Sequence, residues 1–466
     1  MPARPTLRIR NPATGRVLEA LRADDAASVR ARFRAARAAQ PAWAAVPLDQ
    51  RIAAIGRFAE QVASQRERLA ATLTSEVGKP IRQSRNEIAG FLDRIAFFTA
   101  ETPQVLRPET VLAPESAKGA GLTERITQEP LGVVANISAW NYPYFVGGNV
   151  FIPALLAGNA VLYKPSEFAA LTGLAIARLL HESGIPPEIF VPLIGGPEVG
   201  SALLRQQVDG IYFTGSHGTG RKIARAAAGR MIRLQLELGG KDPVYVCDDI
   251  GDLGQIAAAV ADGAFYNTGQ SCCSVERIYV HRRIFDRFLS AFVAEVKGYK
   301  MGDPLDEATY IGPVTRAPQR AVLEAQIADA RRKGAKVLAG GKRRRGAGNY
   351  FEPTVLAGVD HTMDVMREES FGPVIGLMPV ADDHEALRLM NDTAYGLTAG
   401  VYTPDWVRAE KLLAKVKSGS AYWNCCDRVS PRLPWSGRGH SGLGLTLSRA
   451  GILAFTQPKA WHLKPA

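Results

Sequence analysis

The feature that most constrains this fold is an alternation of short apolar runs and amphipathic helices that begins near Gly132. Strands are predicted at "GVVANISA" (132–139), "AVLYKP" (160–165), "IFVPLIG" (189–195) and "GIYFTGS" (210–216), with helices between them. Short strand-to-helix connections favour right-handed crossovers, which make the strands parallel. The pattern predicts a doubly wound α/β sheet, which binds ligands at the carboxyl ends of its strands.

The chain is too long for one hydrophobic core. Single cores stop growing at about 250–300 residues, and this chain has 466. Residues 24–99 carry apolar residues at helical spacing, and a second α/β series follows "RLQLELGG" (233–240). We therefore expect at least two domains, with a hinge at Gly239 and Gly240.

Charge and hydropathy exclude several classes of protein. The net charge is +12, but its densest run, "KRRR" (342–345), lies between glycines without interleaved aromatics, which indicates a solvated loop and no nucleic-acid partner. No apolar run approaches the roughly 20 residues that span a bilayer, and "MPARPTLRIR" is unlike a secretory signal. We expect a soluble cytoplasmic protein without a membrane partner.

Five cysteines are present, and two of them are adjacent in "FYNTGQSCCS" (265–274). An odd number of cysteines favours reduced thiols. The sequence has no Cys-x₂-Cys pair and no histidine cluster near the cysteines, so it gives little support for a metal site. Neighbouring cysteines rarely form a disulfide with each other because the bond would be strained. In an extended stretch Cys272 and Cys273 point in opposite directions, so one of them can face a cleft.

Three further stretches hold candidate binding residues, and each also has an ordinary structural interpretation. "YFTGSHGTG" places Gly215 and Ser216 at a helix start, where a phosphate binds well, although a plain turn is also expected there. "YKPSE" (163–167) is explained equally by an N-cap at Ser166. In "RLQLELGG", strand alternation puts Glu237 opposite the leucines, as in a solvated strand carboxylate.

Together the motifs resemble the NAD(P)-dependent aldehyde dehydrogenase superfamily over nearly the whole chain. The resemblance is carried by "NPATGRVLEAL", "EPLGVVANISAWNYP", "GNAVLYKPSE", "YFTGSHGTG", "LELGGKDP", "FYNTGQSCCS", "EESFGPV", "YGLTAGVYTPD" and "LPWSGRGHSGLG", in this order. It implies an NAD-binding domain (1–111 and 131–238), a catalytic domain (239–452) and oligomerisation strands (112–130 and 453–466). A homodimer or homotetramer is expected.

The resemblance also implies a catalytic set. The family pattern G-Q-x-C assigns the nucleophile to Cys272. Asn141 and the backbone N–H of Cys272 would hold the oxyanion, and Glu237 would activate the water that hydrolyses the thioester to the carboxylic acid. The intact "LELGG" favours hydrolysis of the thioester by water over transfer of the acyl group to CoA. A CoA-acylating dehydrogenase and a cysteine acyl-hydrolase are the less favoured alternatives.

The implied cofactor is NAD, with NADP used more weakly. Lys164 and Glu167 would bind the adenosine ribose, Ser216 the pyrophosphate, and Glu369 the nicotinamide ribose. Without the resemblance, Glu369 and Phe371 would be taken for an acidic turn and a core aromatic. The expected cofactor residues are Ser138, Trp140, Lys164, Ser166, Glu167, Gly215, Ser216, Leu238, Gly239, Glu369 and Phe371.

The expected substrate tunnel is mainly aromatic and aliphatic. Its predicted residues are Tyr142, Phe145, Val146, Asn149, Ser271, Cys273, Arg428, Val429 and Trp435. Many succinate-semialdehyde dehydrogenases have an arginine where this chain has Asn149, so we expect neutral aldehydes of medium size to be preferred. A semialdehyde substrate is the alternative, with Arg428 or Arg432 near the tunnel mouth as the source of the missing cation.

Overall fold

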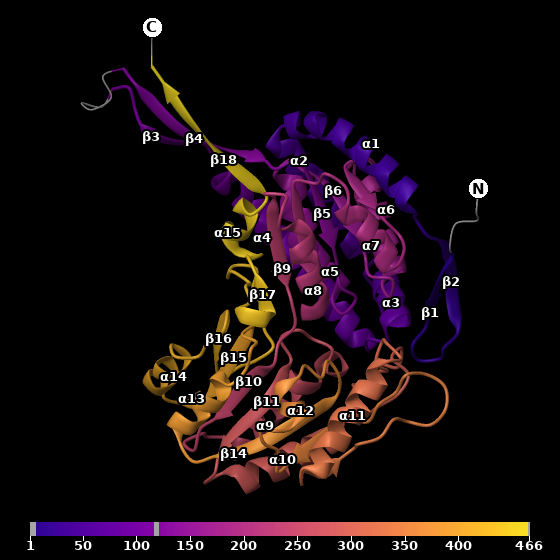
Figure 1. The fold of residues 1–466 in the computed structure, drawn as a ribbon, viewed down its shortest axis with the longest axis vertical. Coiled ribbons are helices and arrows are strands. Elements are labelled where there is room, and N and C mark those ends of the chain that lie inside the picture. Colours follow the sequence, from indigo (N-terminus) through magenta and orange to yellow (C-terminus); the bar gives the residue numbers. More distant parts are fainter. Residues whose placement is uncertain (1–5, 116–120, 465–466) are drawn as a thin grey trace.

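Two sheets, each almost entirely parallel, form the body of the protein and lie one above the other along its long axis (Figure 1). The computed structural model describes residues 6–115 and 121–464. The predicted doubly wound α/β architecture is confirmed. In this part of the chain no helix combines the length and the apolar character needed to cross a bilayer.

The first sheet has the strand order β17-β9-β8-β5-β6-β7. Its strands are β5 (Val133–Ile137), β6 (Ala160–Lys164), β7 (Phe190–Pro192), β8 (Gly210–Thr214), β9 (Arg233–Glu237) and β17 (Gly442–Leu443), and only β17 is antiparallel to its neighbour. The linking helices are α5 (Pro143–Leu156), α6 (Ala170–Glu182), α7 (Pro197–Leu204) and α8 (His217–Ala227). Strands β5 and β6 are buried throughout, as their unbroken apolar runs predict.

The N-terminal region is helical, as expected, and is preceded by a short hairpin. The hairpin is β1 (Thr6–Arg10) and β2 (Val17–Arg22), and the helices are α1 (Ala26–Ala45), α2 (Leu48–Ser64), α3 (Arg66–Val77) and α4 (Ile81–Val105). Helix α5 begins at Pro143, because proline is favoured in the first turn of a helix. A Cβ at Gly148 would overlap the ring of Phe91, so this glycine lets α4 lie close against α5.

The second sheet has the strand order β12-β13-β14-β11-β10-β15-β16. Its strands are β10 (Asp242–Val246), β11 (Val275–His281), β12 (Lys336–Ala339), β13 (Thr354–Ala357), β14 (Val374–Val380), β15 (Thr398–Tyr402) and β16 (Ser420–Trp423). Its helices are α9 (Leu253–Phe265), α10 (Phe285–Gly298), α11 (Gln319–Arg332), α12 (Asp364–Arg367), α13 (Asp383–Asn391) and α14 (Trp406–Leu413). The chain crosses from β9 to β10 at the predicted hinge glycines.

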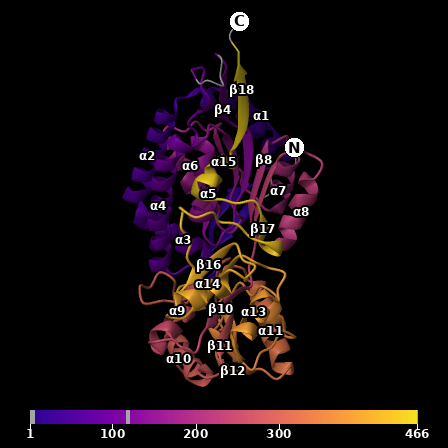
Figure 2. The ribbon, with the colours of Figure 1, turned by 90° about the vertical axis from the view of Figure 1, so that its left-hand side faces the viewer.

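A third sheet projects from the body and consists of β3 (Glu109–Leu112), β4 (Thr123–Pro130) and β18 (Thr456–Leu463) (Figures 1 and 2). As expected, the C-terminal strand pairs with β4, with Thr456 opposite Pro130 and Leu463 opposite Thr123. Residues 116–120 and 465–466 of the two predicted oligomerisation segments lie outside the described residues. Just before β18, β17 and α15 (Ser448–Leu453) return the chain to the first sheet and α4.

Candidate active site

Two cavities meet at Cys272 and Glu237, and both residues line each of them. We call the first the aromatic pocket, a cavity of about 290 Å³. It contains every predicted tunnel residue: Tyr142, Phe145, Val146, Asn149, Ser271, Cys273, Arg428, Val429 and Trp435. Arg432, the second cation expected at the tunnel mouth, is not among the lining residues.

We call the second cavity the strand-end groove, because it lies at the carboxyl ends of β5, β8 and β9. It is lined by Trp140, Asn141, Gly215, Ser216, Leu238, Gly239, Glu369 and Phe371. The other predicted cofactor residues, Ser138, Lys164, Ser166 and Glu167, follow β5 and β6 and do not line this groove. They continue the same row of strand ends, since the Ser138 N–H donates to the carbonyl of Lys164 at 3.0 Å.

The loop that carries Cys272 is held in an unusual backbone conformation. Asn267 and Thr268 adopt φ values of 53° and 59°, in the left-handed region that costs energy for residues other than glycine. The buried Asn267 amide donates to the carbonyl oxygens of Asn141 and Gln270, at 3.2 and 3.0 Å. These bonds hold the cysteine loop against Asn141.

The two adjacent cysteines differ in their surroundings. Cys272 is partly exposed, whereas Cys273 is buried and its Sγ donates to Asp427 at 3.0 Å. A hydrogen bond with Cys272, together with burial, raises the pKa of Cys273 well above its usual value. A Cβ at Gly240 would lie only 2.7 Å from the carbonyl oxygen of Cys272, so the backbone of residue 240 passes close to this cysteine. Cys272 therefore carries the accessible sulfur.

Two hydrogen-bond donors belong to the lining around Cys272, since Asn141 lines the strand-end groove together with this cysteine. The Asn141 Nδ2 donates to the Gln270 carbonyl at 3.2 Å and keeps its second hydrogen available. Among the described residues, the backbone N–H of Cys272 has no hydrogen-bond acceptor. Asn141 lines the strand-end groove, and Cys272 lines both cavities.

Glu237 is buried, which overturns the interpretation of a solvated strand carboxylate. Strand β17 covers the edge of β9, with Gly442 opposite Glu237. Glu237 accepts hydrogen bonds from Thr446, from Gln235 at 2.9 Å and from Thr214 at 3.4 Å. Burial raises the pKa of Glu237 to about 7. A carboxylate that titrates near neutral pH is suited to general base catalysis.

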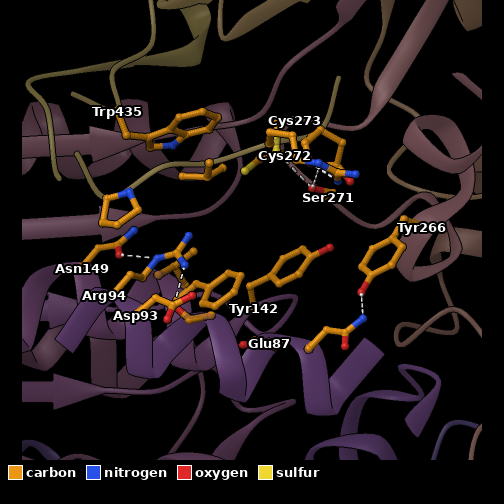
Figure 3. A pocket seen from close by; sticks show the side chains of 18 of the residues that line it. Glu87, Asp93, Arg94, Tyr142, Asn149, Tyr266, Ser271, Cys272, Cys273 and Trp435 are labelled. Atoms are coloured by element: carbon orange, nitrogen blue, oxygen red, sulfur yellow. Dashed lines mark hydrogen bonds between the residues drawn. The ribbon is translucent and has the colours of Figure 1, made fainter. Parts of the chain in front are cut away.

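The aromatic pocket has a wall that the sequence analysis missed. Helix α4 contributes Gln83, Asn86, Glu87, Gly90, Asp93 and Arg94, and Tyr266, Asp427 and Pro431 complete the lining. Figure 3 shows Arg94, Asn149 and Tyr142 across the pocket from Cys272 and Ser271. The predicted aromatic and aliphatic residues line the pocket, but α4 adds charged side chains to it from a segment without a family motif.

A helical signal for Arg94 was present in the sequence. Phe91, Arg94, Ile95 and Phe98 lie at the spacing of one helix face, and all four are buried. The Arg94 Cζ lies 3.6 Å from the ring centroid of Phe145, and the Lys79 Nζ lies 3.6 Å from that of Tyr142. The buried face of α4 also carries Glu87, so charged residues recur on it among apolar ones, which indicates a polar site inside the protein.

The nicotinamide-ribose candidates lie on the far side of the groove. Glu369 accepts a hydrogen bond from the Gly240 N–H at 3.1 Å, and burial raises its pKa to about 8. Phe371 has a φ of 46° and packs edge-to-face on Trp140, with ring centroids 5.5 Å apart. A Cβ at Gly239 would overlap the Glu369 carboxylate. Both side chains therefore border a cavity, unlike an acidic turn and a core aromatic.

The phosphate and ribose candidates have suitable chemistry. Ser216 caps α8, where its Oγ accepts from the Thr219 N–H at 3.4 Å, and such helix starts bind phosphate. Lys164 Nζ lies 3.4 Å from Glu167 Oε2. Ser166 does not cap α6, which begins at Ala170. The sequence analysis missed the α11 side of the groove, formed by Arg316, Gln319 and Val322. Within residues 6–115 and 121–464 no group of His, Cys, Asp or Glu is arranged to hold a metal ion.

Comparisons with known proteins all point to one family. The profile described as "Aldehyde dehydrogenase family" matches residues 2–461. A Mycobacterium ulcerans protein named "Putative succinate-semialdehyde dehydrogenase [NADP(+)] 2" is 36% identical over 98% of this chain and 88% of its own length. The "Betaine aldehyde dehydrogenase" of Rhizobium etli is 35% identical over 97% of this chain and 92% of its own length.

Solved structures agree with these relatives. PnpE from Pseudomonas sp. WBC-3, whose structure is also known in complex with nicotinamide adenine dinucleotide, superposes with a TM-score of 0.94. The two sequences are 33% identical, and the match covers 99% of this chain and 94% of PnpE.

Proposed function

The chain belongs to the aldehyde dehydrogenase family and oxidises an aldehyde to the carboxylic acid with NAD(P), and from this premise we propose that Cys272 is its nucleophile and Glu237 its hydrolytic base. One observation carries the proposal. Cys272 and Glu237 both lie where the aromatic pocket and the strand-end groove meet, so they can act in turn on one carbonyl carbon.

Cys272 starts the reaction. Its thiolate attacks the aldehyde carbon, and the carbonyl oxygen takes up the negative charge in a hemithioacetal. The amide of Asn141 and the backbone N–H of Cys272 stabilise that oxygen. A donor of this kind typically contributes about 2.7–4 kcal/mol to the transition state. The available hydrogen of Asn141 and the unpaired N–H of Cys272 support this assignment.

NAD fits the donor set at the strand ends. We assign Lys164 and Glu167 to the adenosine ribose, Ser216 to the pyrophosphate and Glu369 to the nicotinamide ribose, beside Phe371. Carboxylates accept hydrogen bonds from ribose hydroxyls, and the start of α8 offers N–H groups to phosphate. When bound, NAD supplies the two-electron acceptor for the oxidation. Glu167 disfavours the 2′-phosphate of NADP, an effect that Lys164 partly offsets.

Glu237 completes the cycle by removing a proton from the water that hydrolyses the Cys272 thioester. Its pKa of about 7 supports this role, because part of the carboxylate population is ionised at neutral pH. The presence of Glu237 favours hydrolysis of the thioester by water over transfer of its acyl group to CoA. No histidine lines either cavity, which argues against a cysteine–histidine acyl-hydrolase.

We further assign NAD binding to residues 1–111 and 131–238 and catalysis to 239–452. Residues 112–130 and 453–466 would join subunits into a homodimer or homotetramer. The three-stranded sheet supports this assignment, since β3 and β18 are its edges and open edges favour strand pairing. The five free cysteines are compatible with a cytoplasmic location.

The test uses the purified protein with NAD and a panel of aliphatic, aromatic and carboxylated aldehydes. NADH formation is followed by absorbance, and the product acid is identified by mass spectrometry. One molecule of acid for each NADH supports the proposal. NADH without free acid, or acid only when CoA is present, would contradict the role of Glu237.

A further inference from the structure

Arg94 is a buried guanidinium that forms no ion pair among the described residues, although the charge of Glu87 acts against the lowering of its pKa by burial. It is 4% exposed. Its Nε donates to Asn149 Oδ1 at 3.2 Å and its Nη1 to the Gly90 carbonyl at 2.9 Å. A guanidinium has five N–H groups, yet among the described residues Nη2 has no acceptor and no carboxylate pairs with Arg94. An unpaired buried charge is strongly disfavoured, so buried charges are normally paired.

Arg277 shows how this chain satisfies another buried guanidinium. Its Nε, Nη1 and Nη2 donate to the carbonyls of Lys241, Leu389 and Met390, at 2.8, 2.9 and 2.9 Å. Arg51 is also buried and has unpartnered nitrogens, but it lines neither cavity described above. A buried arginine is therefore not by itself a ligand site. Arg94 differs from Arg51 because it lines a cavity.

Arg94 and Asn149 both line the aromatic pocket, across from Cys272 (Figure 3). The ring of Phe145 lies against one face of the guanidinium, at 3.6 Å, and fixes its plane. Asn149 uses its Oδ1 to hold Arg94, which turns its Nδ2 into a second donor, and within the described residues this Nδ2 has no acceptor. Two neighbouring donors and a positive charge match a carboxylate.

The neighbouring charges do not satisfy Arg94. Glu87 pairs with Lys79 and accepts from the Tyr144 N–H at 3.0 Å. Asp427, near Cys272, accepts from Ser271 and Cys273. Asp93 is exposed and forms no ion pair with Arg94.

Lys79 and Arg94 together disfavour a positively charged aldehyde. Aromatic faces bind cations, and the stacked rings of Tyr142 and Phe145, 5.6 Å apart, are the aromatic faces on this wall. Lys79 already lies over the first ring and Arg94 over the second. Lys79 is paired with Glu87, so a quaternary ammonium group would meet the unpaired charge of Arg94 here.

We propose that Arg94 and Asn149 form an anion subsite that binds the distal carboxylate of an aldehyde acid, so that short ω-oxo carboxylic acids are the preferred substrates. This proposal rests on the proposed function, because the aldehyde end must react at Cys272. It reverses the preference for neutral aldehydes expected from the sequence. The cation absent at position 149 is supplied by α4, and Asn149 orients it.

The test compares an acid with an uncharged analogue of the same chain length, 4-oxobutanoate and its methyl ester. We expect wild-type kcat/KM to favour the acid by at least about tenfold. Arg94→Gln should lower this acid-to-ester ratio by about 10- to 100-fold. The matched control is Arg82→Gln, which removes an exposed arginine from the same helix and should leave the ratio unchanged.

A second variant covers the case in which Arg94→Gln does not fold. Asn149→Asp keeps Arg94 and places a carboxylate beside it, which fills the subsite from within and should also abolish the preference for the acid. A further measurement needs no turnover. A short dicarboxylate, such as succinate, should slow the alkylation of Cys272 by iodoacetamide in the wild type, and its dimethyl ester should not.

The outcomes separate the two proposals. If the wild type oxidises the ester as well as the acid, or if Arg94→Gln lowers both equally, the anion subsite is wrong. A ratio that falls with Arg428→Ala and not with Arg94→Gln would assign the anchor to Arg428 instead. Absence of NADH with every aldehyde would overturn the proposed function, and the subsite with it.

Discussion

Thr446 donates a hydrogen bond to Glu237 from 209 positions further along the chain. The backbone of Thr446 pairs with that of Trp435, through N–H to carbonyl bonds of 2.9 and 2.8 Å in the two directions. One short bridge thus places Trp435 in the aromatic pocket and the Thr446 hydroxyl on the base. The C-terminal segment therefore contributes to the lining of the aromatic pocket and affects the protonation of Glu237.

The first prediction concerns this hydroxyl. Thr446→Val removes a donor that stabilises the ionised form of Glu237, so the pKa of Glu237 rises further above its present value of about 7. In the proposed role Glu237 acts in its deprotonated form, so hydrolysis should increase as pH rises through this pKa. We expect the midpoint of the pH profile for acid release to move to higher pH by about one unit. Thr446→Ser should keep the wild-type midpoint, and an unchanged midpoint in Thr446→Val would contradict the prediction.

The second prediction separates the two chemical steps. Glu237→Gln should still release about one NADH per active site in a rapid burst, because oxidation precedes hydrolysis. Steady-state acid release should then fall by about 10²–10⁴-fold. Rapid-mixing absorbance measures the burst, and mass spectrometry detects the acyl group on Cys272. Loss of the burst would mean that Glu237 acts earlier, for instance on the thiol.

The third prediction distinguishes the adjacent cysteines. Cys272→Ala should lower turnover by at least about 10³-fold, as removal of a nucleophile does. Cys273→Ala should retain most of the turnover, because this thiol is buried and its raised pKa keeps it protonated. Steady-state NADH formation by both variants is the measurement. An inactive Cys273→Ala that folds normally by circular dichroism would show that the assignment of the nucleophile is wrong.

The fourth prediction concerns cofactor choice. We expect kcat/KM to be higher with NAD than with NADP, since Glu167 repels a 2′-phosphate. Glu167→Gln should raise kcat/KM with NADP by roughly tenfold, corresponding to about 1.4 kcal/mol of removed repulsion. Isothermal titration of both nucleotides provides a readout independent of turnover. Equal wild-type values for the two cofactors would refute the role of Glu167.

The fifth prediction concerns assembly. The edges of the projecting sheet should pair with other subunits, which gives a mass of two or four times the 50.2 kDa of one chain. Sedimentation equilibrium measures this mass directly. A monomer at micromolar concentration would contradict the proposed role of the third sheet.

The positions of the sheets and of the reactive loop could be predicted from the amino-acid sequence. Their signals are local: the apolar runs of β5 and β6 indicate strands buried on both faces, and "FYNTGQSCCS" carries its motif within ten residues. The alternation of strands and helices also predicted a ligand site at the carboxyl ends of the strands, because parallel strands align these ends. The assignment of Ser216 and Glu237 to that site came from the family resemblance, since each also has an ordinary local interpretation.

The electrostatics of the site and the far wall of the pocket could not be predicted, because they depend on contacts between distant segments. Strand alternation places Glu237 on a face but does not say whether β17 covers it, and its pKa depends on that burial. Arg94 carries no motif, and its contact with Asn149 exists because Gly148 lets α4 approach α5 closely. Such contacts join segments that are distant in sequence, and a charge in a pocket depends on its partners in space, which local periodicity does not record.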